Sequence, residues 1–252
     1  MKQAICLLSR DVHIEWLEFL NKFTYYDIFI CIDNNDEDYQ KKYSDAFSHI
    51  SFIQIKNETC REQGYTNCNS CVGFPEIISW DKAIYYFSER EQTYDNVWLI
   101  EEDVFFMNEN VLKRIDSTFP ESDLLTSFHN INPNGEMDSW NHWVNVIHRI
   151  DPPWAHSMVC ACRVSCKLFS EIKKYKTIHG HLFFIEAMFN TIAHQSNLIV
   201  NTPQQLSCVH WNTSWNRDNI NIDQVYHPFK NIDDHNYIRE SHSNGLDLVP
   251  PS

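Results

Sequence analysis

Short apolar runs and helix-like spacings alternate along the first half of the chain. Clusters of β-branched and aromatic residues predict strands over 4–9, 26–32, 51–55, 97–106 and 124–128. Apolar side chains three and four positions apart predict helices over 13–23 and 80–90. Strands that alternate with helices in this way are typical of an α/β protein with a mostly parallel central sheet flanked by helices. In open sheets of this type, ligands bind beyond the carboxyl ends of the strands.

The second half of the chain is less regular. Its patterns predict helices over 164–172 and 183–194 and short strands over 198–200 and 206–210. Residues 57–73 are interpreted as a polar, cysteine-bearing loop, and the polar stretch 231–252 as a tail that is packed on the surface or loosely ordered. Neither a repeat nor a low-complexity linker interrupts the chain. We therefore expect a single domain over 1–252 that consists of a sheet half, 1–130, a second half, 131–230, and the tail.

Composition excludes several classes of function. With 252 residues, 43% of them hydrophobic, the chain can bury a large core. Its net charge is −14 and it has no Lys/Arg block, so we expect no nucleic-acid partner, because tracking a phosphate backbone needs a basic surface. Only five glycines are present, and neither a glycine-rich phosphate loop nor a G-x-S-x-G elbow occurs. Phosphate binding would then require a metal ion.

The apolar runs are too short to cross a bilayer, which takes roughly 20 residues. The run after Lys2 is also too short for a signal sequence and is better interpreted as a first strand. These observations predict no membrane span and a cytoplasmic location. In that compartment most of the nine cysteines would be reduced, and their odd number argues against complete pairing.

Three cysteines lie within the predicted loop. Cys68 and Cys71 form a C-x-x-C pair, and Cys60 precedes them. One interpretation is a zinc site completed by Cys60 or by a distant histidine. The other is a set of reduced thiols or one loop-closing disulfide. A complete set of four ligands at standard spacing is missing, so we expect no structural zinc.

Three consecutive acids interrupt the most apolar strand. The segment 96–106 reads Asn-Val-Trp-Leu-Ile-Glu-Glu-Asp-Val-Phe-Phe. Side chains alternate along a strand, so Glu101 and Asp103 would share one side. Carboxylates beside a core are costly unless they are compensated, and a hard divalent cation would compensate them and leave positions open for phosphate oxygens. Alternatively, the strand ends here and the acids point into water.

Three segments together resemble the GT-A glycosyltransferases. Glu101-Glu102-Asp103 is similar to their acidic "DXD" motif, and the helix that opens with Ser79-Trp80-Asp81-Lys82-Ala83 is similar to the helix before that motif. The later segment Val225-Tyr226-His227-Pro228-Phe229-Lys230 resembles a C-terminal His-Pro-x-Lys element. The resemblance implies a GT-A-like, Rossmann-related domain. It also implies an enzyme that moves a sugar from a nucleoside-diphosphate sugar to an acceptor hydroxyl with Mn²⁺ or Mg²⁺.

The resemblance also implies roles for individual residues. Asp103 and Glu101 would hold the metal with His227, and His210 is the competing histidine. The donor, UDP- or GDP-linked, would contact Asp33, Asp81, Lys82, Glu101, Glu102, Asp103 and Lys230. Residues 1–130 would form the nucleotide-sugar half and residues 131–230 the acceptor half. The acceptor itself could be a glycan, a protein or a lipid.

A single acid stands in the apolar helix predicted around 183–189. Glu186 would have a raised pKa there unless it is paired, which suits a general base. It resembles the helix-borne acid of inverting GT-A enzymes and is our candidate catalytic residue. Alternatively, Glu186 lies on a solvent face or pairs with a neighbour such as His181.

Two other functions fit the same acids. One is a metal-dependent phosphohydrolase or nucleotidyltransferase, which would react at phosphorus and not at the sugar carbon. The other is a non-catalytic protein that binds nucleotides or carbohydrates on a GT-A-like scaffold. Inversion at the sugar is our favoured outcome for the transferase.

Overall fold

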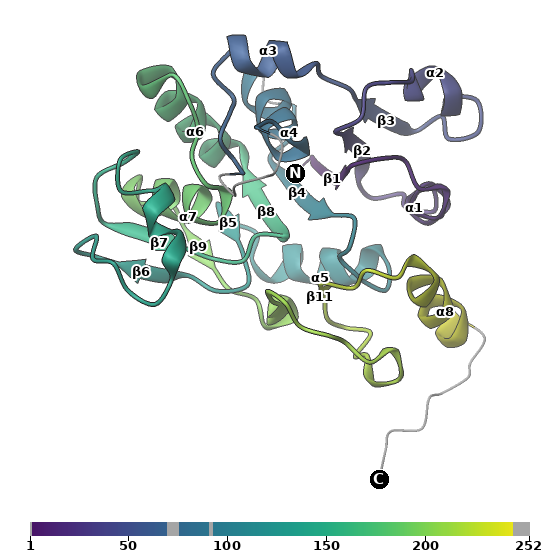
Figure 1. Cartoon of the computed structure of the whole chain (residues 1–252). Coiled ribbons are helices and arrows are strands. Elements are labelled where there is room, and N and C mark those ends of the chain that lie inside the picture. The colour runs from purple at the N-terminus through teal and green to yellow at the C-terminus, as the bar shows by residue number, and fades with distance from the viewer. Residues whose placement is uncertain (1, 70–75, 91–92, 244–252) are drawn as a thin grey trace.

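A seven-stranded sheet forms the centre of the computed structural model, which describes residues 2–69, 76–90 and 93–243 (Figure 1). The strands are β1 (Gln3–Ser9), β2 (Asp27–Ile32), β3 (Ile50–Ile53), β4 (Asn96–Glu101), β5 (Leu124–Leu125), β8 (Ala161–Ser165) and β9 (Val200–Asn201). Their order is β3-β2-β1-β4-β8-β5-β9, and only β8 runs antiparallel to its neighbours. The predicted fold class, α/β with a mostly parallel central sheet flanked by helices, is confirmed.

Eight α-helices and two small sheets complete the described part of the chain. The helices are α1 (Ile14–Leu20), α2 (Tyr39–Tyr43), α3 (Asn57–Glu62), α4 (Ser79–Glu89), α5 (Glu109–Thr118), α6 (Cys166–His179), α7 (Ile185–Gln195) and α8 (Ile232–Ser243). One small sheet pairs β6 (Asn130–Asn132) with β7 (Trp154–His156), and the other pairs β10 (Cys208–Val209) with β11 (Tyr226–His227). Three 3₁₀ turns are η1 (Asn141–Asn145), η2 (Gln204–Leu206) and η3 (Arg217–Asn219).

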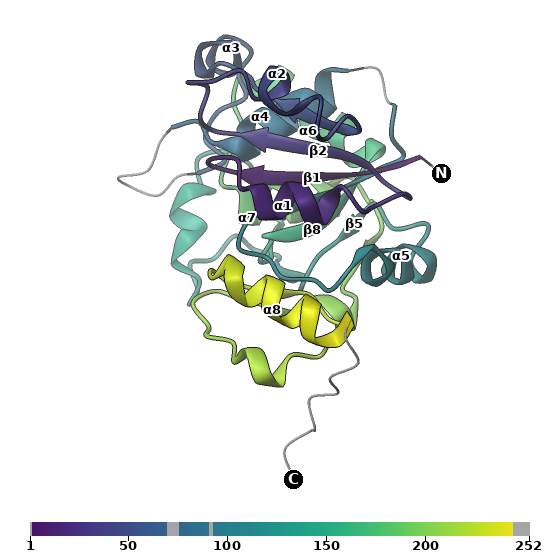
Figure 2. The same ribbon diagram turned by 90° about the vertical axis from the view of Figure 1, so that its right-hand side faces the viewer.

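Two hydrophobic layers sandwich the sheet. Ala4, Cys6 and Leu8 of β1 face a core that is shared with α4, α6 and α7. Ile5 and Leu7 face the opposite core, which is shared with α1 and α5. Figure 2 shows α4 and α6 on one side of β1 and β2, and α1 on the other. A parallel strand that is covered on both faces reads as an unbroken apolar run, which explains why β1 was recognisable from sequence.

The strand predicted over 97–106 is shorter than expected. β4 ends at Glu101, and Glu102 and Asp103 form a turn in which the Val104 amide donates to the Glu101 carbonyl at 3.1 Å. The alternation argument for Glu101 and Asp103 therefore does not apply. The strand predicted over 124–128 is likewise reduced to the two residues of β5.

Several elements escaped the sequence patterns. The expected loop over 57–73 begins with α3, and β8 precedes the helix that was expected from residue 164. The Ser165 side chain caps α6 by accepting from the Leu168 amide at 3.1 Å, which sets the helix start at Cys166. The helix continues to His179 and ends at Gly180, whose φ of 75° is the left-handed conformation that glycine adopts readily.

The segment expected to be a tail contains a helix. α8 buries His235 and Ile238, which join a small cluster with Phe105 and Phe229. Its polar sequence hides this packing because few of its positions are apolar. Residues 244–252 lie outside the described residues. Within the described ranges, every helix is too short or too polar to span a bilayer.

Candidate functional site

The last residue of β4 and the turn after it carry the three acids at the edge of the sheet. The Glu101 amide donates to the Cys160 carbonyl at 2.8 Å, and the Glu102 amide donates to the Leu8 carbonyl at 3.1 Å. The turn is thus hydrogen-bonded to the segments on both sides of β4. This edge is formed by the carboxyl ends of β1, β2 and β4, where ligands of open α/β sheets bind.

A distant segment brings His227 to the acids. Phe105 and Tyr226 exchange two backbone hydrogen bonds of 2.9 Å, and the Phe229 amide donates to the Asp103 carbonyl at 2.6 Å. As a result His227 Nε2 lies 3.4 Å from Asp103 Oδ1 and 3.6 Å from Glu101 Oε2. Ligands about 2.0–2.2 Å from one metal ion are separated by roughly 3.0–3.4 Å, so this spacing suits a shared cation.

The tautomer of His227 also suits a ligand. Its Nδ1 lies 2.7 Å from the His210 carbonyl oxygen, a contact that places the proton on Nδ1 and leaves Nε2 facing the carboxylates. Burial lowers the pKa of His227, but Asp103 and Glu101 outweigh it, and the net shift is upward. The two carboxylates therefore favour positive charge at this position, as a proton on the ring or as a cation. His210 contributes its backbone, and its own side chain is exposed.

A thiol joins this group. The ligand atoms of Glu101, Cys160 and His227 all lie within 4.8 Å of one another. Burial raises the pKa of the Cys160 thiol, and the neighbouring Glu101 raises it further. The sequence patterns did not indicate this contact, because it depends on a chain segment 59 positions after Glu101 that runs beside β4. Cys60 and Cys68 are buried, and the eight described cysteines are free of disulfides, whereas Cys71 of the C-x-x-C pair lies outside the described residues.

Two further contacts hold the acids in place. Trp80 Nε1 donates to Glu101 Oε1 at 2.7 Å, and the Ser9 hydroxyl donates to Glu102 Oε2. Burial raises the pKa of Glu101, and Asp103 adds to the shift. A cation beside these carboxylates would lower the free-energy cost of ionising them in this buried position, because it stabilises their ionised forms.

One pocket of about 610 Å³ lies over the ends of β1, β2 and β4. Ionic side chains line much of it: Arg10, His13, Asp33, Glu101, Glu102, Asp103 and Lys230. Burial raises the pKa of Asp33 to about 6, against the effect of nearby Lys82. Five of the residues expected to contact the nucleotide sugar (Asp33, Glu101, Glu102, Asp103 and Lys230) are thus brought together here.

Asp81 and Lys82 lie beneath this pocket and do not line it. Both are fully buried. Asp81 accepts from the Ile78 amide at 3.0 Å and from the Cys68 amide at 3.1 Å, and burial raises its pKa to about 7. Lys82 Nζ donates to the Asp33 carbonyl at 2.6 Å. The structure therefore gives both side chains a supporting position under the pocket wall, and their predicted contact with a donor stays a prediction.

A second pocket of about 740 Å³ adjoins the first. The two share Asn69, Ile78, Trp80, Glu101, Asp103 and Lys230 as lining residues. Glu186, at the start of α7, lines the second pocket, and its backbone carbonyl accepts from the Ser157 amide at 2.9 Å. Burial raises the pKa of Glu186 to about 7, Glu101 contributes to the rise, and His227 opposes it. A half-buried carboxyl group with that pKa can take up a proton near neutral pH.

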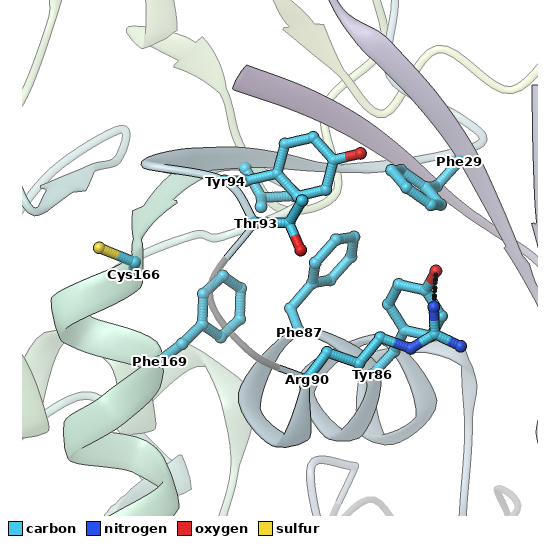
Figure 3. A pocket seen from close by; sticks show the side chains of 9 residues that line it. Phe29, Tyr86, Phe87, Arg90, Thr93, Tyr94, Cys166 and Phe169 are labelled. Carbon is cyan, nitrogen blue, oxygen red and sulfur yellow. Dashed lines mark hydrogen bonds between the residues drawn. The ribbon is translucent and has the colours of Figure 1, made fainter. Parts of the chain in front are cut away.

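A third, smaller hollow of about 170 Å³ lies at the opposite end of β4 (Figure 3). Rings from Phe29, Phe87, Tyr94 and Phe169 converge on it, and Arg90 donates to the Tyr86 hydroxyl at 2.8 Å at its side. Val97, at the start of β4, also lines it, whereas the acids follow the strand's other end. No acid is among the described lining residues of this hollow, and it lies apart from the residues that could bind a metal ion.

Comparison with known proteins found weak structural similarity. No protein-family model matches the sequence, and no curated protein matches it either. Mouse xyloside xylosyltransferase 1, in its apo form, has a TM-score of 0.40 at 10% identity, over 80% of this chain and 84% of that one. The S. cerevisiae mannosyltransferase Ktr4p, in complex with GDP, has a TM-score of 0.36 at 11% identity, over 76% of this chain and 65% of that one. Similarity at this level carries no evidence about chemistry.

Proposed function

We propose that this protein is a metal-dependent glycosyltransferase that moves a sugar from a nucleoside-diphosphate sugar to an acceptor hydroxyl with inversion. One observation carries the proposal: two adjacent pockets of different chemistry meet at Glu101 and Asp103. The first pocket, which lies over the strand ends and is called the ionic pocket from here on, suits a charged donor. The second pocket holds the Glu186 carboxyl group, whose pKa is raised. A transferase needs both sites side by side, because the sugar crosses from one ligand to the other.

The residues at the junction fit a divalent cation. Asp103 and Glu101 supply oxygen, His227 supplies Nε2, and the His210 carbonyl fixes the imidazole orientation. When bound, Mn²⁺ or Mg²⁺ would supply positive charge that stabilises the departing diphosphate. Lys230 lines both pockets and would pair with a phosphate oxygen. Asp33 and Glu102 would contact the base, the ribose or ordered water on the donor side.

Glu186 would act as the general base. Its carboxylate takes the proton of the acceptor hydroxyl as the acceptor oxygen forms a bond to the anomeric carbon. The bond from that carbon to the diphosphate oxygen breaks, and the diphosphate leaves with the electron pair. Because the attack comes from the face opposite the leaving group, the product has the inverted configuration. A base whose pKa is about 7 is available in its ionised form above neutral pH.

A donor panel tests this function directly. The protein is heated with UDP- and GDP-linked sugars in the presence of Mn²⁺, Mg²⁺ or a chelator. A ligand that binds only the native state raises the melting temperature, so the proposal expects stabilisation by one nucleotide class that disappears with chelator. NMR of the products then identifies the bond that is cleaved.

The products separate the alternatives. Free or transferred sugar together with nucleoside diphosphate supports the transferase. Release of inorganic phosphate or of a sugar phosphate would instead identify a phosphohydrolase or nucleotidyltransferase. Metal-dependent binding of a donor without cleavage of that donor would indicate a non-catalytic nucleotide-binding protein. The absence of metal-dependent stabilisation by every donor would contradict the proposal.

A further inference from the structure

The outer part of the second pocket is an aromatic wall. Trp140 stacks on His156 with ring centroids 4.1 Å apart, and His142 stacks on Phe184 at 4.9 Å. All four side chains line the pocket that contains Glu186. They come from η1 and its preceding residue, from β7 and from the residue before α7, so tertiary folding assembles the wall. Flat rings held by one another present fixed surfaces and lose little conformational entropy when a ligand stacks on them.

The wall is uncharged near neutral pH. Burial lowers the pKa of His156 to about 4 and also lowers the pKa of His142, so both rings stay neutral. Among the described lining residues of the second pocket, Lys230 is the single Lys or Arg, and it lies where the two pockets meet. On that inner side Glu186 adds a carboxyl group. An acceptor with phosphate, sulfate or carboxylate groups would therefore find little compensating charge along the wall.

Trp211 is the most exposed aromatic residue that lines this pocket. Its side chain is 75% exposed, in the loop between β10 and β11. Neighbouring Asn212 adopts a φ of 52° and also lines the pocket. Exposure of so large an apolar surface is unfavourable in the free protein, and burial by a ligand removes that cost. Amide groups, neutral imidazoles and aromatic faces are together suited to a ligand with apolar ring faces and hydroxyl edges.

We infer that the acceptor is a neutral sugar whose ring stacks on exposed Trp211 and contacts the half-buried Trp140 and His142 of the aromatic wall, with one hydroxyl directed at Glu186. This inference rests on the proposed glycosyltransferase function and adds the acceptor class to it. The pocket volume of about 740 Å³ lies in the range of small-molecule sites and admits a sugar with its aglycone. A neutral sugar can stack its apolar face on the aromatic rings and direct its hydroxyl groups to the amide and imidazole groups of the lining. A phosphorylated acceptor, a charged peptide or a long acyl chain lacks this combination.

Binding of defined acceptor probes tests the inference. Saturation-transfer NMR and intrinsic tryptophan fluorescence are recorded with methyl glucoside, galactoside, mannoside and xyloside. The counter-probes are the 6-phosphates of glucose and mannose, a charged serine-containing peptide and 1-octanol, whose chain reports on lipid-like acceptors. Binding is measured with Mn²⁺ and either UDP or GDP present. At least one neutral methyl glycoside should bind more tightly than its phosphorylated counterpart.

Two variants of Trp211 test whether the glycoside binds at this residue. Trp211→Ala should weaken glycoside binding about tenfold, the factor for 1.4 kcal/mol of lost stacking, and Trp211→Phe should recover most of it. Tyr25→Ala is the matched control, since Tyr25 is 48% exposed and lies outside both pockets. Melting temperatures of all variants report on folding.

The outcomes separate this inference from the function on which it rests. Metal-dependent nucleotide binding with no glycoside binding, or with preferred binding of the sugar phosphates, the peptide or the alkyl chain, overturns the acceptor inference alone. Unchanged glycoside affinity in folded Trp211→Ala also overturns it. Glycoside binding without nucleotide binding contradicts the glycosyltransferase proposal, and the acceptor role falls with it.

Discussion

The two adjoining pockets share six lining residues and differ in the chemistry of the others and in the elements that supply them. The ionic pocket is built largely from strand ends and the turns after them, at Ser9, Asp33 and Glu101–Asp103. The second pocket, called the aromatic pocket below, is lined on its outer side by Trp140, Phe184 and Trp211. These residues come from loops and element ends far apart in sequence. Strand ends place charges rigidly, whereas loops supply broad surfaces that can vary without disturbing the sheet. Under the proposed function, donor chemistry and acceptor choice would be encoded in separate parts of the chain.

The largest expected effect is at the base, because it separates the reaction from donor binding. Glu186→Gln should lower kcat by about 10²–10⁴, the usual contribution of a general base. Affinity for the nucleotide sugar should stay near wild type, since Glu186 lines the aromatic pocket and not the ionic one. Steady-state kinetics and calorimetry measure the two quantities. Near-normal turnover, or a product that retains the donor's anomeric configuration, would refute the base assignment.

The next effect tests the ionic pocket on its own. Asp103→Ala should remove metal-dependent binding of a nucleoside diphosphate, with a loss of at least the roughly 10–100-fold that even indirect perturbation of a metal site causes. Calorimetry with and without Mn²⁺ measures it. Glu121→Ala is the control, because Glu121 is exposed and lines neither pocket. Unchanged metal-dependent affinity in a folded Asp103→Ala protein would contradict the assignment of Asp103 as a metal ligand.

Two histidines on paired strand segments sharpen the metal assignment. His227→Ala should weaken the metal dependence of nucleotide binding about tenfold or more. His210→Ala should leave it unchanged, because the atom that orients His227 is the His210 carbonyl, which alanine retains. The same calorimetric titration compares both variants. If only His210→Ala loses the metal dependence, the ligand is His210.

The thiol at the junction should alter the choice of metal. Cys160 would add sulfur to the proposed N/O ligand set, and sulfur favours borderline ions such as Zn²⁺ and Co²⁺ over Mg²⁺. With Co²⁺ the wild type should show a thiolate-to-cobalt absorption band in the near ultraviolet, and Cys160→Ser should lack it. Cys208→Ser, a partly exposed cysteine outside the cluster, should keep the band. A wild-type cobalt complex without that band shows that Cys160 is not a ligand.

The smallest effect is on stability and follows from the raised pKa of Glu186. The folded state keeps this proton up to about pH 7, whereas the unfolded chain loses it near pH 4.3. Stability is therefore lost as pH rises through this window and levels off above it. Glu186→Gln removes the titration, so its melting temperature relative to wild type should rise between pH 4.5 and 7 and then stay constant. A chain of this size gains about 2–4 °C per kcal/mol. A difference that is independent of pH, measured by calorimetry, would show that Glu186 is not buried as described.

Much of the ionic pocket was predictable from sequence. The acids in the apolar strand, Asp33 and Lys230 were expected to contact one ligand, and the structure brings them together at one edge of the parallel strands. Glu186 was also visible as a single acid in an apolar helix. These features are local, since a strand or an amphipathic helix is recorded in the spacing of a few neighbouring side chains.

The site contacts that the sequence could not indicate depend on long-range pairing. Cys160 reaches Glu101 only because its segment pairs with β4, and β8 carried no recognisable strand pattern before α6. Asp81 and Lys82 were predicted to contact a donor, which stays a prediction, and the structure shows backbone partners that fix both side chains beneath the first pocket. A charged side chain at a helix start is equally compatible with either position, so composition could not decide between them.

The sequence by itself determined the α/β class, the central strands and the acids at their ends, because hydrophobic periodicity and strand polarity are local properties of the chain. Tertiary structure alone decided that His227 and not His210 faces the carboxylates, that α8 packs where a tail was expected, and that Trp140, Phe184 and Trp211 line one pocket. Those outcomes depend on which distant backbone groups pair and which surfaces cover one another. Such choices are settled by the free energy of the whole fold and leave no periodic trace in the sequence.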